Sequence, residues 1–226
     1  MQQLLLDLAP VPAPTLDNFA PGRNAEPVRA LRAWATGAGE PVVYLWGPPG
    51  SGKTHLLSGA AGEAHRQGAD ARFTAASELE AGDWTQASAW LALDDVDTLP
   101  AQGQAALFTL LNRAAHGEVR LLLAGAIAPA GLTLREDVRT RMGAALVFQL
   151  HPLDDEEKAL ALQAHAHGRG FELPREAARY LLRHGHRDLR WLMTVLDALD
   201  RYSLQTRRPI TLPLLREVLG TYRLPR

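Results

Sequence analysis

The fold is decided by the stretch Gly47-Pro48-Pro49-Gly50-Ser51-Gly52-Lys53-Thr54, which has the spacing Gly-x-x-x-x-Gly-Lys-Thr. Its glycines allow the backbone to turn so that successive N–H groups point at phosphate oxygens. Lys53 would place its ammonium between the β- and γ-phosphates, and Thr54 would offer a hydroxyl to Mg²⁺. The stretch therefore predicts a phosphate-binding loop that holds ADP or ATP together with Mg²⁺.

The sequence on either side of this loop has the character that such a loop needs. Residues 42–46, Val-Val-Tyr-Leu-Trp, are a short apolar run of strand-forming residues, which predicts a buried strand. From Thr54 to about Gly68 the pattern is that of a helix, whose positive N-terminal end would favour phosphate. His55 follows the loop on that helix, and we expect it to contribute a backbone N–H to the phosphates.

A pair of acidic residues follows the loop in the sequence, at a separation typical of a P-loop and its metal-binding carboxylate. Residues 90–93, Trp-Leu-Ala-Leu, predict a second buried strand, which we expect to neighbour the strand before the loop. It ends in Asp94 and Asp95. Asp94 is the candidate carboxylate for the Mg²⁺ shell. Asp95 is the candidate catalytic residue that orients a water, because a carboxylate there can accept a proton.

Strands and helices alternate through the first two thirds of the chain. Further helices are expected at 24–36 and 102–115, and further strands at 71–74, 119–124 and 145–150. Such alternation predicts a parallel sheet covered by helices on both faces. From Leu153 onward the pattern is helical only, with helices at about 154–168, 174–184, 187–203 and 211–220. The sequence thus predicts an α/β nucleotide-binding domain at residues 15–151, followed by a small all-helical domain at residues 152–226.

Composition excludes several classes of protein. The chain of 226 residues has a net charge of −1 and 46% hydrophobic residues, so bulk charge does not favour nucleic acid or membrane binding. It contains no cysteine, which excludes disulfides and thiolate metal sites. No apolar run approaches the roughly 18 residues of a membrane-spanning helix, and no signal peptide is evident. We therefore expect a cytoplasmic protein without a membrane partner.

The first 14 residues predict an apolar peptide on a tether. Residues 1–8 are rich in leucine, and prolines follow at positions 10, 12 and 14. Proline at this density disfavours both helix and sheet, so the segment is expected to be extended.

Together these features resemble an AAA+ ATPase of the DnaA initiator branch, with a helical lid after the P-loop domain. Residues 16–24, Leu-Asp-Asn-Phe-Ala-Pro-Gly-Arg-Asn, are similar to the stretch that enters the DnaA ATPase domain and lies by the adenine. Residues 107–113 and 169–174 are similar to stretches of the Hda family. That family shares the DnaA ATPase core without its DNA reader, and inactivates DnaA after replication starts, together with the polymerase sliding clamp. The resemblance covers essentially the full length.

The resemblance implies roles for residues that spacing alone does not single out. Four residues of the N-terminal peptide match the clamp-binding peptide, in which an amide bonds the pocket rim and alternate leucines fill a groove. These residues are Gln3, Leu4, Leu6 and Leu8. Arg141 matches the arginine finger that acts on a neighbouring subunit's ATP, with Arg135 and Arg139 as rivals for that role. Arg187 matches the sensor-2 arginine that reaches the bound nucleotide from the lid, and Arg190 is its competitor.

One position departs from the family pattern. After the expected strand at 119–124, the family places a polar sensor-1 residue that helps position the attacking water. Here Ala126 stands at that position, and no side chain from Ala124 to Ala128 can form a hydrogen bond. We therefore expect nucleotide binding but only weak intrinsic ATP hydrolysis.

The resulting functional hypothesis is a regulator of replication initiation. Tethered to the sliding clamp and carrying ADP or ATP, it would stimulate hydrolysis of DnaA-bound ATP through Arg141. The alternatives are an autonomous AAA+ ATPase or loader, and a nucleotide-gated adaptor without a catalytic arginine. The implied partners are DnaA, the clamp and further copies of the chain as a homo-oligomer. No recognition helix or concentrated basic patch is evident, so direct sequence-specific DNA binding is not expected.

Overall fold

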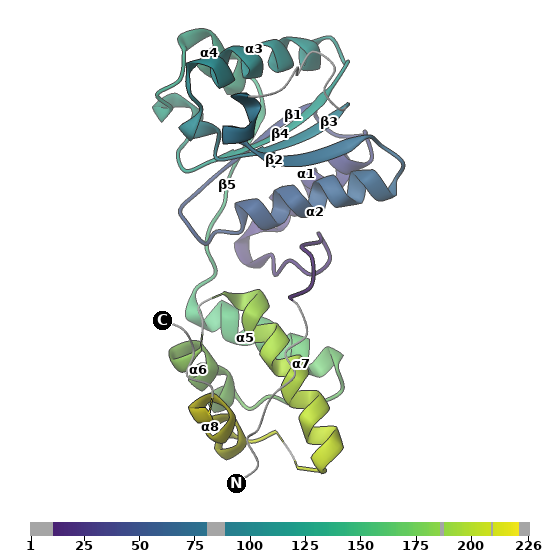
Figure 1. Ribbon diagram of the computed structural model, residues 1–226, viewed down its shortest axis with the longest axis vertical. Helices are drawn as coiled ribbons and strands as arrows, with labels where there is room; N and C mark the ends of the chain where they lie inside the picture. The colour runs from purple at the N-terminus through teal and green to yellow at the C-terminus, as the bar shows by residue number, and fades with distance from the viewer. Residues whose placement is uncertain (1–10, 81–88, 186–187, 209, 222–226) are drawn as a thin grey trace. The chain divides into compact units, whose positions relative to one another are not determined.

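The protein consists of two compact units, residues 14–152 and the residues from 153 onward (Figure 1). The structure is a computed structural model that describes residues 11–80, 89–185, 188–208 and 210–221. The first unit is built on a sheet, and the described part of the second is built of helices. The sheet unit carries the phosphate-binding loop.

Five parallel strands form the sheet, in the order β2-β3-β4-β1-β5. The strands are β1 (Val42–Trp46), β2 (Ala71–Ala75), β3 (Trp90–Asp94), β4 (Arg120–Gly125) and β5 (Leu146–Gln149). Apolar residues dominate β1, β3 and β4 because both faces of these strands are covered. All five strands end at the same edge of the sheet, where the loop after β1 and the acids after β3 therefore meet.

Helices cover both faces of this sheet (Figure 1). One face carries α1 (Ala25–Ala35) and α2 (Lys53–Arg66), and the other carries α3 (Ala101–Ala115) and α4 (Glu136–Gly143). Side chains alternate between the two resulting cores, as the period of a strand requires: in β4, Leu121 and Leu123 join the α3 side while Leu122 joins the α2 side. The predicted α/β fold class is confirmed. Short 3₁₀ turns complete the unit at η1 (Gly22–Asn24), η2 (Ala76–Glu80), η4 (Val96–Thr98) and η5 (Pro129–Gly131).

The strand order corrects one expectation. We expected the strand ending in Asp94 to neighbour the strand before the phosphate-binding loop, but β4 lies between them and pairs with both. Helical crossovers let a later strand insert between two earlier ones, so order along the chain does not fix order in the sheet. The carboxylate after β3 must therefore reach the loop across the end of β4.

The second unit is an all-helical bundle around its own core. Its helices are α5 (Asp155–Gly168), α6 (Arg175–His184), α7 (Leu189–Thr206) and α8 (Leu212–Thr221). A capping box opens α5, in which Asp154 and Glu157 each bond the other's backbone N–H. Leu162, Leu181 and Leu196 are fully buried where α5, α6 and α7 meet. The predicted small helical domain after the sheet domain is confirmed as a fold class.

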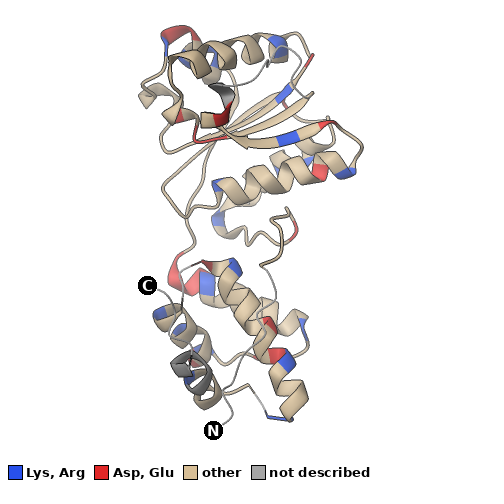
Figure 2. Cartoon of the chain, viewed as in Figure 1, with Lys and Arg blue, Asp and Glu red and all other residues tan. Residues whose placement is uncertain are grey.

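Charged side chains of both signs are interspersed along the described helices (Figure 2). In the helical unit, for example, Glu156 of α5 pairs with Arg175 and Arg179 of α6. These arginines hold the pKa of the Glu156 carboxyl below its usual range, mainly through their hydrogen bonds. Among the described residues, no helix is both long and apolar enough to span a bilayer.

Candidate nucleotide-binding site

The loop between β1 and α2 has the backbone that its glycines predict. Gly50 and Gly52 adopt φ values of 77° and 91°, in the left-handed region that glycine adopts without strain. Gly52 is the N-cap residue of α2, so the loop runs directly into the positive end of that helix. The Ser51 N–H donates to the Pro48 carbonyl over 3.3 Å, which closes the turn. The result is a glycine turn that leads into a helix N-terminus, a geometry that binds anions.

Lys53 holds its ammonium at this loop. Nζ donates to the carbonyl oxygens of Gly47 over 2.7 Å and of Pro48 over 3.1 Å. None of the ion pairs between described residues involves Lys53, and its ammonium is held by hydrogen bonds to backbone carbonyls. Such an ammonium is available to an anion in the loop.

Thr54 and Asp94 meet although their strands are not neighbours. Thr54 Oγ1 donates to Asp94 Oδ2 over 2.5 Å, and Asp94 is only 5% exposed. The other carboxylate oxygen of Asp94 accepts the Asp95 N–H over 3.0 Å. Both oxygens are thus oriented, with the hydroxyl and a carboxylate oxygen at one point. Hard oxygen ligands of this kind suit Mg²⁺.

Asp95 has a left-handed backbone conformation, and its surroundings disfavour the charged form of its carboxyl. Its φ is 55°, a left-handed conformation that costs a non-glycine residue energy and often marks a functional site. Burial raises the pKa of the Asp95 carboxyl, and the nearby Asp94 and Asp97 raise it further, while Lys53 acts in the opposite direction. A carboxyl whose proton affinity is raised is better suited to accept a proton from water.

Ser51 supplies the observation that tests whether the loop fits a phosphate. The Ser51 side chain is 4% exposed, and its Oγ is buried without a hydrogen-bond partner in the protein. Buried hydroxyls in native proteins are nearly always satisfied, so this atom calls for a partner from outside the chain. With the Lys53 ammonium and the Gly52 helix cap beside it, the loop fits a phosphate group.

The end of β4, by contrast, is closed by hydrogen bonds to its backbone. The Ala126 N–H donates to Asp97 Oδ1 over 3.2 Å, and the Tyr44 hydroxyl donates to the Ile127 carbonyl over 2.6 Å. A Cβ on Gly125 would lie 2.5 Å from the Tyr44 oxygen, so only glycine fits here. Burial also raises the pKa of the Tyr44 phenol well above its usual range. Sequence reasoning did not identify Asp97, because a turn acid after a strand is usually only solvated.

The arginines proposed for the finger lie on or beside α4, a helix that the sequence did not predict. Arg141 is exposed, and its guanidinium lies 5.1 Å from the ring centroid of Phe108. Arg135 is 5.9 Å from the same ring, and its Nη2 pairs with Asp137 over 2.6 Å. Arg139 is half-buried. An exposed arginine braced by an aromatic face can reach another molecule, whereas Arg135 is already neutralised by an acid.

Other predicted residues lie elsewhere. Arg190 is in the first turn of α7, where its Nη2 is 3.8 Å from Asp188 Oδ2. Arg187 lies outside the described residues, as do the four residues of the N-terminal peptide, Gln3, Leu4, Leu6 and Leu8. Their predicted roles therefore remain predictions. The His55 side chain bonds the Thr15 carbonyl, a contact that the sequence did not reveal.

Comparison with known proteins gives one partial family match and several structures of similar fold. Residues 155–219, which include α5, α6 and α7, match the family model described as "Hda, lid domain". Domain III of the Thermotoga maritima replication initiation protein DnaA has a similar structure. The match covers 95% of this chain and 98% of that chain. The TM-score of that match is 0.68, at 21% identity. Residues 155–219 are thus similar to the lid domain of the Hda family, and the chain shares the fold of domain III of DnaA.

Two further solved structures have a similar fold. AMPPCP-bound DnaA from Aquifex aeolicus matches with a TM-score of 0.69 and 21% identity, over 89% of this chain and 69% of that chain. The RuvB Holliday junction branch migration motor of Thermotoga maritima matches with a TM-score of 0.64 and 19% identity, over 95% and 74% of the two chains. At these identities the matches establish the fold of this chain, and the Hda lid model matches residues 155–219.

Proposed function

We propose that this AAA+ protein binds ATP or ADP with Mg²⁺ at residues 47–54. The observation that carries this proposal is the buried Ser51 hydroxyl without a partner, in a loop that also presents the Lys53 ammonium. The loop amides and Lys53 would hold the phosphates, and His55 would add its backbone N–H at the start of α2. The AMPPCP carried by DnaA of Aquifex aeolicus, which has the same fold, supports an adenine nucleotide.

Thr54 and Asp94 would hold the metal ion. Their oxygens already lie 2.5 Å apart, and Asp94 is fixed in place by the Asp95 N–H. Mg²⁺ usually keeps several waters and takes one or two protein oxygens, so this pair is sufficient. When bound, the ion would neutralise phosphate charge. Arg187 is the lid residue that we assign to the nucleotide, with Arg190 as the alternative.

We further propose that the protein regulates replication initiation by acting on DnaA. The Hda lid match and the DnaA-like fold support this assignment. Arg141 would stabilise the charge that develops on the γ-phosphate of DnaA-bound ATP. The exposure of Arg141 on α4 and the absence of an acidic partner for it among the described residues support this choice over Arg135. Arginines in this role accelerate hydrolysis by about 10³- to 10⁵-fold.

The protein's own ATP turnover would be weak. Asp95 would orient a water, but Ala126 has no side chain that could hydrogen-bond to that water. The end of β4 is instead held by its own contacts with Asp97 and Tyr44. These observations disfavour an autonomous motor. In this proposal Gln3, Leu4, Leu6 and Leu8 bind the sliding clamp and bring the protein to DnaA on DNA.

A single-turnover assay tests the regulatory role. ATP labelled on its γ-phosphate is preloaded on DnaA, and hydrolysis is followed after adding DNA-loaded clamp with the wild-type protein or its Arg141→Ala variant. We expect the wild-type protein to accelerate ATP hydrolysis by DnaA only when clamp is present. With Arg141→Ala, the rate of that hydrolysis should be about 10³-fold lower. Arg139→Ala, on the same helix, is the matched control and should retain the acceleration.

Two other outcomes contradict parts of the proposal. Full acceleration by Arg141→Ala would leave a nucleotide-gated adaptor without a catalytic arginine as the better function. No acceleration by the wild-type protein would show that DnaA-bound ATP is not its target.

A further inference from the structure

Residues 15–19, which we call the strap, form a closed turn against the sheet unit. The Thr15 N–H donates to Asn18 Oδ1 over 2.8 Å, and the Asn18 N–H donates to Thr15 Oγ1 over 3.1 Å. These reciprocal bonds fix the turn locally. Leu16 is 2% exposed and belongs to the core shared by α1 and α2. The strap is therefore a folded part of the unit, docked through one buried side chain.

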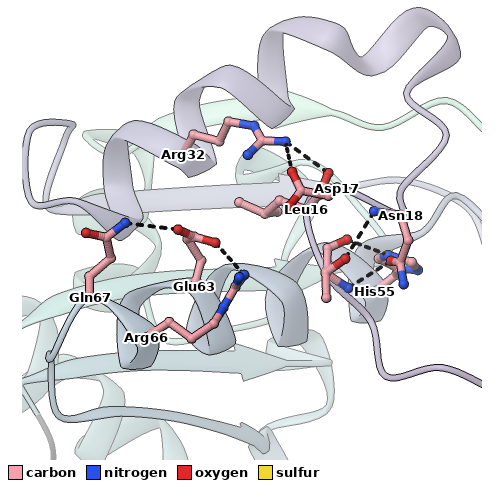
Figure 3. A network of polar contacts seen from close by, with 9 residues as sticks. Leu16, Asp17, Asn18, Arg32, His55, Glu63, Arg66 and Gln67 are labelled. Carbon is pink, nitrogen blue, oxygen red and sulfur yellow. Dashed lines mark hydrogen bonds and ion pairs between the residues drawn. The ribbon is translucent and has the colours of Figure 1, made fainter.

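Two helices hold the strap by polar contacts (Figure 3). From α1, Arg32 Nη2 bonds the Leu16 carbonyl over 3.3 Å and Asp17 Oδ1 over 2.7 Å. From α2, His55 Nε2 lies 2.9 Å from the Thr15 carbonyl oxygen. Because a carbonyl oxygen can only accept, the ring must carry its proton on Nε2 and donate it.

The two contacts differ in strength. The Arg32 and Asp17 side chains are 47% and 69% exposed, and exposed ion pairs contribute little because water screens them. The His55 bond is partly buried, and the ring also meets the Phe19 ring edge-on, with 5.3 Å between centroids. Aromatic contacts of this geometry add to the hydrogen bond. His55 is thus the firmer of the two anchors.

The strap also lies directly on the phosphate-binding loop. A Cβ on Gly52 would lie 2.6 Å from Phe19 Cε2, and a Cβ on Gly59 would lie 2.9 Å from the Thr15 carbonyl carbon. Both glycines are therefore needed for the close approach of the strap. Gly52 is also the residue that joins the loop to α2. A shift of the strap would therefore change the packing against the loop backbone, and a shift of the loop would change the packing against the strap.

We propose that His55 is a positioning residue that couples the strap to the phosphate-binding loop, so that nucleotide at the loop and the docked strap stabilise each other. The coupling rests on the nucleotide binding proposed above. Thermodynamic linkage makes this coupling reciprocal. If docking of the strap raises the affinity for nucleotide by some factor, bound nucleotide raises the docking equilibrium constant of the strap by the same factor. Since the strap follows the N-terminal peptide in the chain, a partner that binds that peptide can act on the nucleotide site through the strap.

Hydrogen exchange and calorimetry test this proposal on the full-length protein. Exchange of the backbone amides of residues 16–19 is measured with and without Mg²⁺-ADP, and ADP affinity is measured by titration. The variants are His55→Ala, His55→Gln, which keeps an N–H donor of similar reach, and His65→Ala. His65 is an exposed histidine on the same helix and provides the matched control.

We expect ADP to slow exchange in the strap of the wild-type protein. His55→Ala should exchange faster there and bind ADP about threefold to tenfold more weakly, as befits the loss of one hydrogen bond. His55→Gln should recover most of both effects, and His65→Ala should match the wild-type protein. Circular dichroism checks that each variant is folded.

The contrary outcomes separate the two proposals. Strap exchange in His55→Ala equal to that in His65→Ala overturns the positioning role of His55. Faster exchange with unchanged ADP affinity overturns the coupling. No ADP binding by the wild-type protein overturns the proposed function itself, while strap exchange in the nucleotide-free protein still tests the His55 contact.

Discussion

The neighbouring strands β3 and β4 end at the same edge of the sheet with opposite chemistry. β3 ends at Asp94, which bonds Thr54 of the phosphate-binding loop, and Asp95 follows it. β4 ends at Gly125 and is followed by Ala126, and neither residue has a polar side-chain atom. Residues 125 and 126 themselves offer backbone polar groups alone; the Ala126 N–H is bonded by Asp97, and the neighbouring Ile127 carbonyl is bonded by Tyr44. This edge of the sheet therefore has side chains suited to bind a nucleotide and its metal, but fewer side chains suited to activate water.

The largest expected effect in this comparison is a loss of nucleotide affinity. Replacing Lys53 by Ala removes the ammonium that bonds the carbonyls of Gly47 and Pro48. Because hydrogen bonds to charged groups contribute up to about 3 kcal/mol, we expect ADP affinity to fall by about 100-fold. Calorimetric titration measures this change. Lys158→Ala removes the other lysine of the chain, in the helical unit, and should bind as the wild-type protein does. Unchanged affinity in Lys53→Ala would remove the basis of the binding proposal.

A second test addresses the closed end of β4. In Gly125→Ala the new Cβ would lie 2.5 Å from the Tyr44 hydroxyl and 2.8 Å from Asp97 Oδ1. These atoms must move, so we expect the free energy of unfolding to fall by about 1–3 kcal/mol, measured by urea denaturation. Gly62→Ala on α2, where a Cβ would meet nothing within 4 Å, is the control and should not destabilise. Equal stability of the two variants would show that the end of β4 is less tightly held than the contacts indicate.

The third test separates the metal from the nucleotide. Asp94→Asn keeps an oxygen for the Thr54 hydroxyl but removes the negative charge beside it. We expect the enhancement of ATP affinity by Mg²⁺ to fall by about tenfold, while metal-free affinity changes little. Asp70→Asn, an exposed acid between α2 and β2, provides the control. A loss of metal-free affinity as large as the loss in Mg²⁺ would instead indicate a structural role for Asp94.

The smallest effect is electrostatic and depends on pH. The pKa of Asp95 is raised above its ordinary value of 3.8 by burial and by Asp94 and Asp97. A raised pKa in the folded state means that stability from the protonated form is present at low pH and is lost as pH rises through the folded-state pKa. Asp95→Asn should therefore be more stable than the wild-type protein near neutral pH, by about 0.5 kcal/mol or less because solvent screens the side chain. The two proteins should be equally stable below about pH 3.

The pH series has a simple contrary result. If Asp95→Asn is less stable than the wild-type protein at neutral pH, the carboxylate makes a favourable contact that outweighs its repulsion by Asp94 and Asp97. Thermal unfolding followed by circular dichroism at several pH values distinguishes the two cases.

Much of the sheet unit could be predicted because β1, β3 and β4 are largely apolar runs. The expected strand at 42–46 coincides with β1, and the expected helix at 102–115 differs from α3 by one residue. By contrast, α4 was missed because it is short and buries only Val138 and Met142, which leaves no apolar period to recognise. The phosphate-binding loop was predictable because its chemistry lies in one contiguous stretch.

The rest of the site depends on contacts between distant segments, which no local pattern encodes. The insertion of β4 between β1 and β3 is set by tertiary packing. The bond from Ala126 to Asp97 joins residues 29 positions apart, and the bond from His55 to Thr15 joins residues 40 apart. Each of these residues is ordinary in its own sequence context. Their roles follow only from the fold.

The central claim, that the loop binds ATP while the end of β4 leaves its hydrolysis slow, can be tested in one measurement. The isolated wild-type protein is mixed with Mg²⁺ and a limiting amount of ATP labelled on its α-phosphate. Filter retention then gives the bound fraction, and chromatography of the retained label gives the ratio of ADP to ATP over time. We expect near-complete retention with most of the label still ATP after many minutes. Absence of retention would contradict the binding claim, and conversion to ADP within seconds would contradict the inferred weakness of hydrolysis.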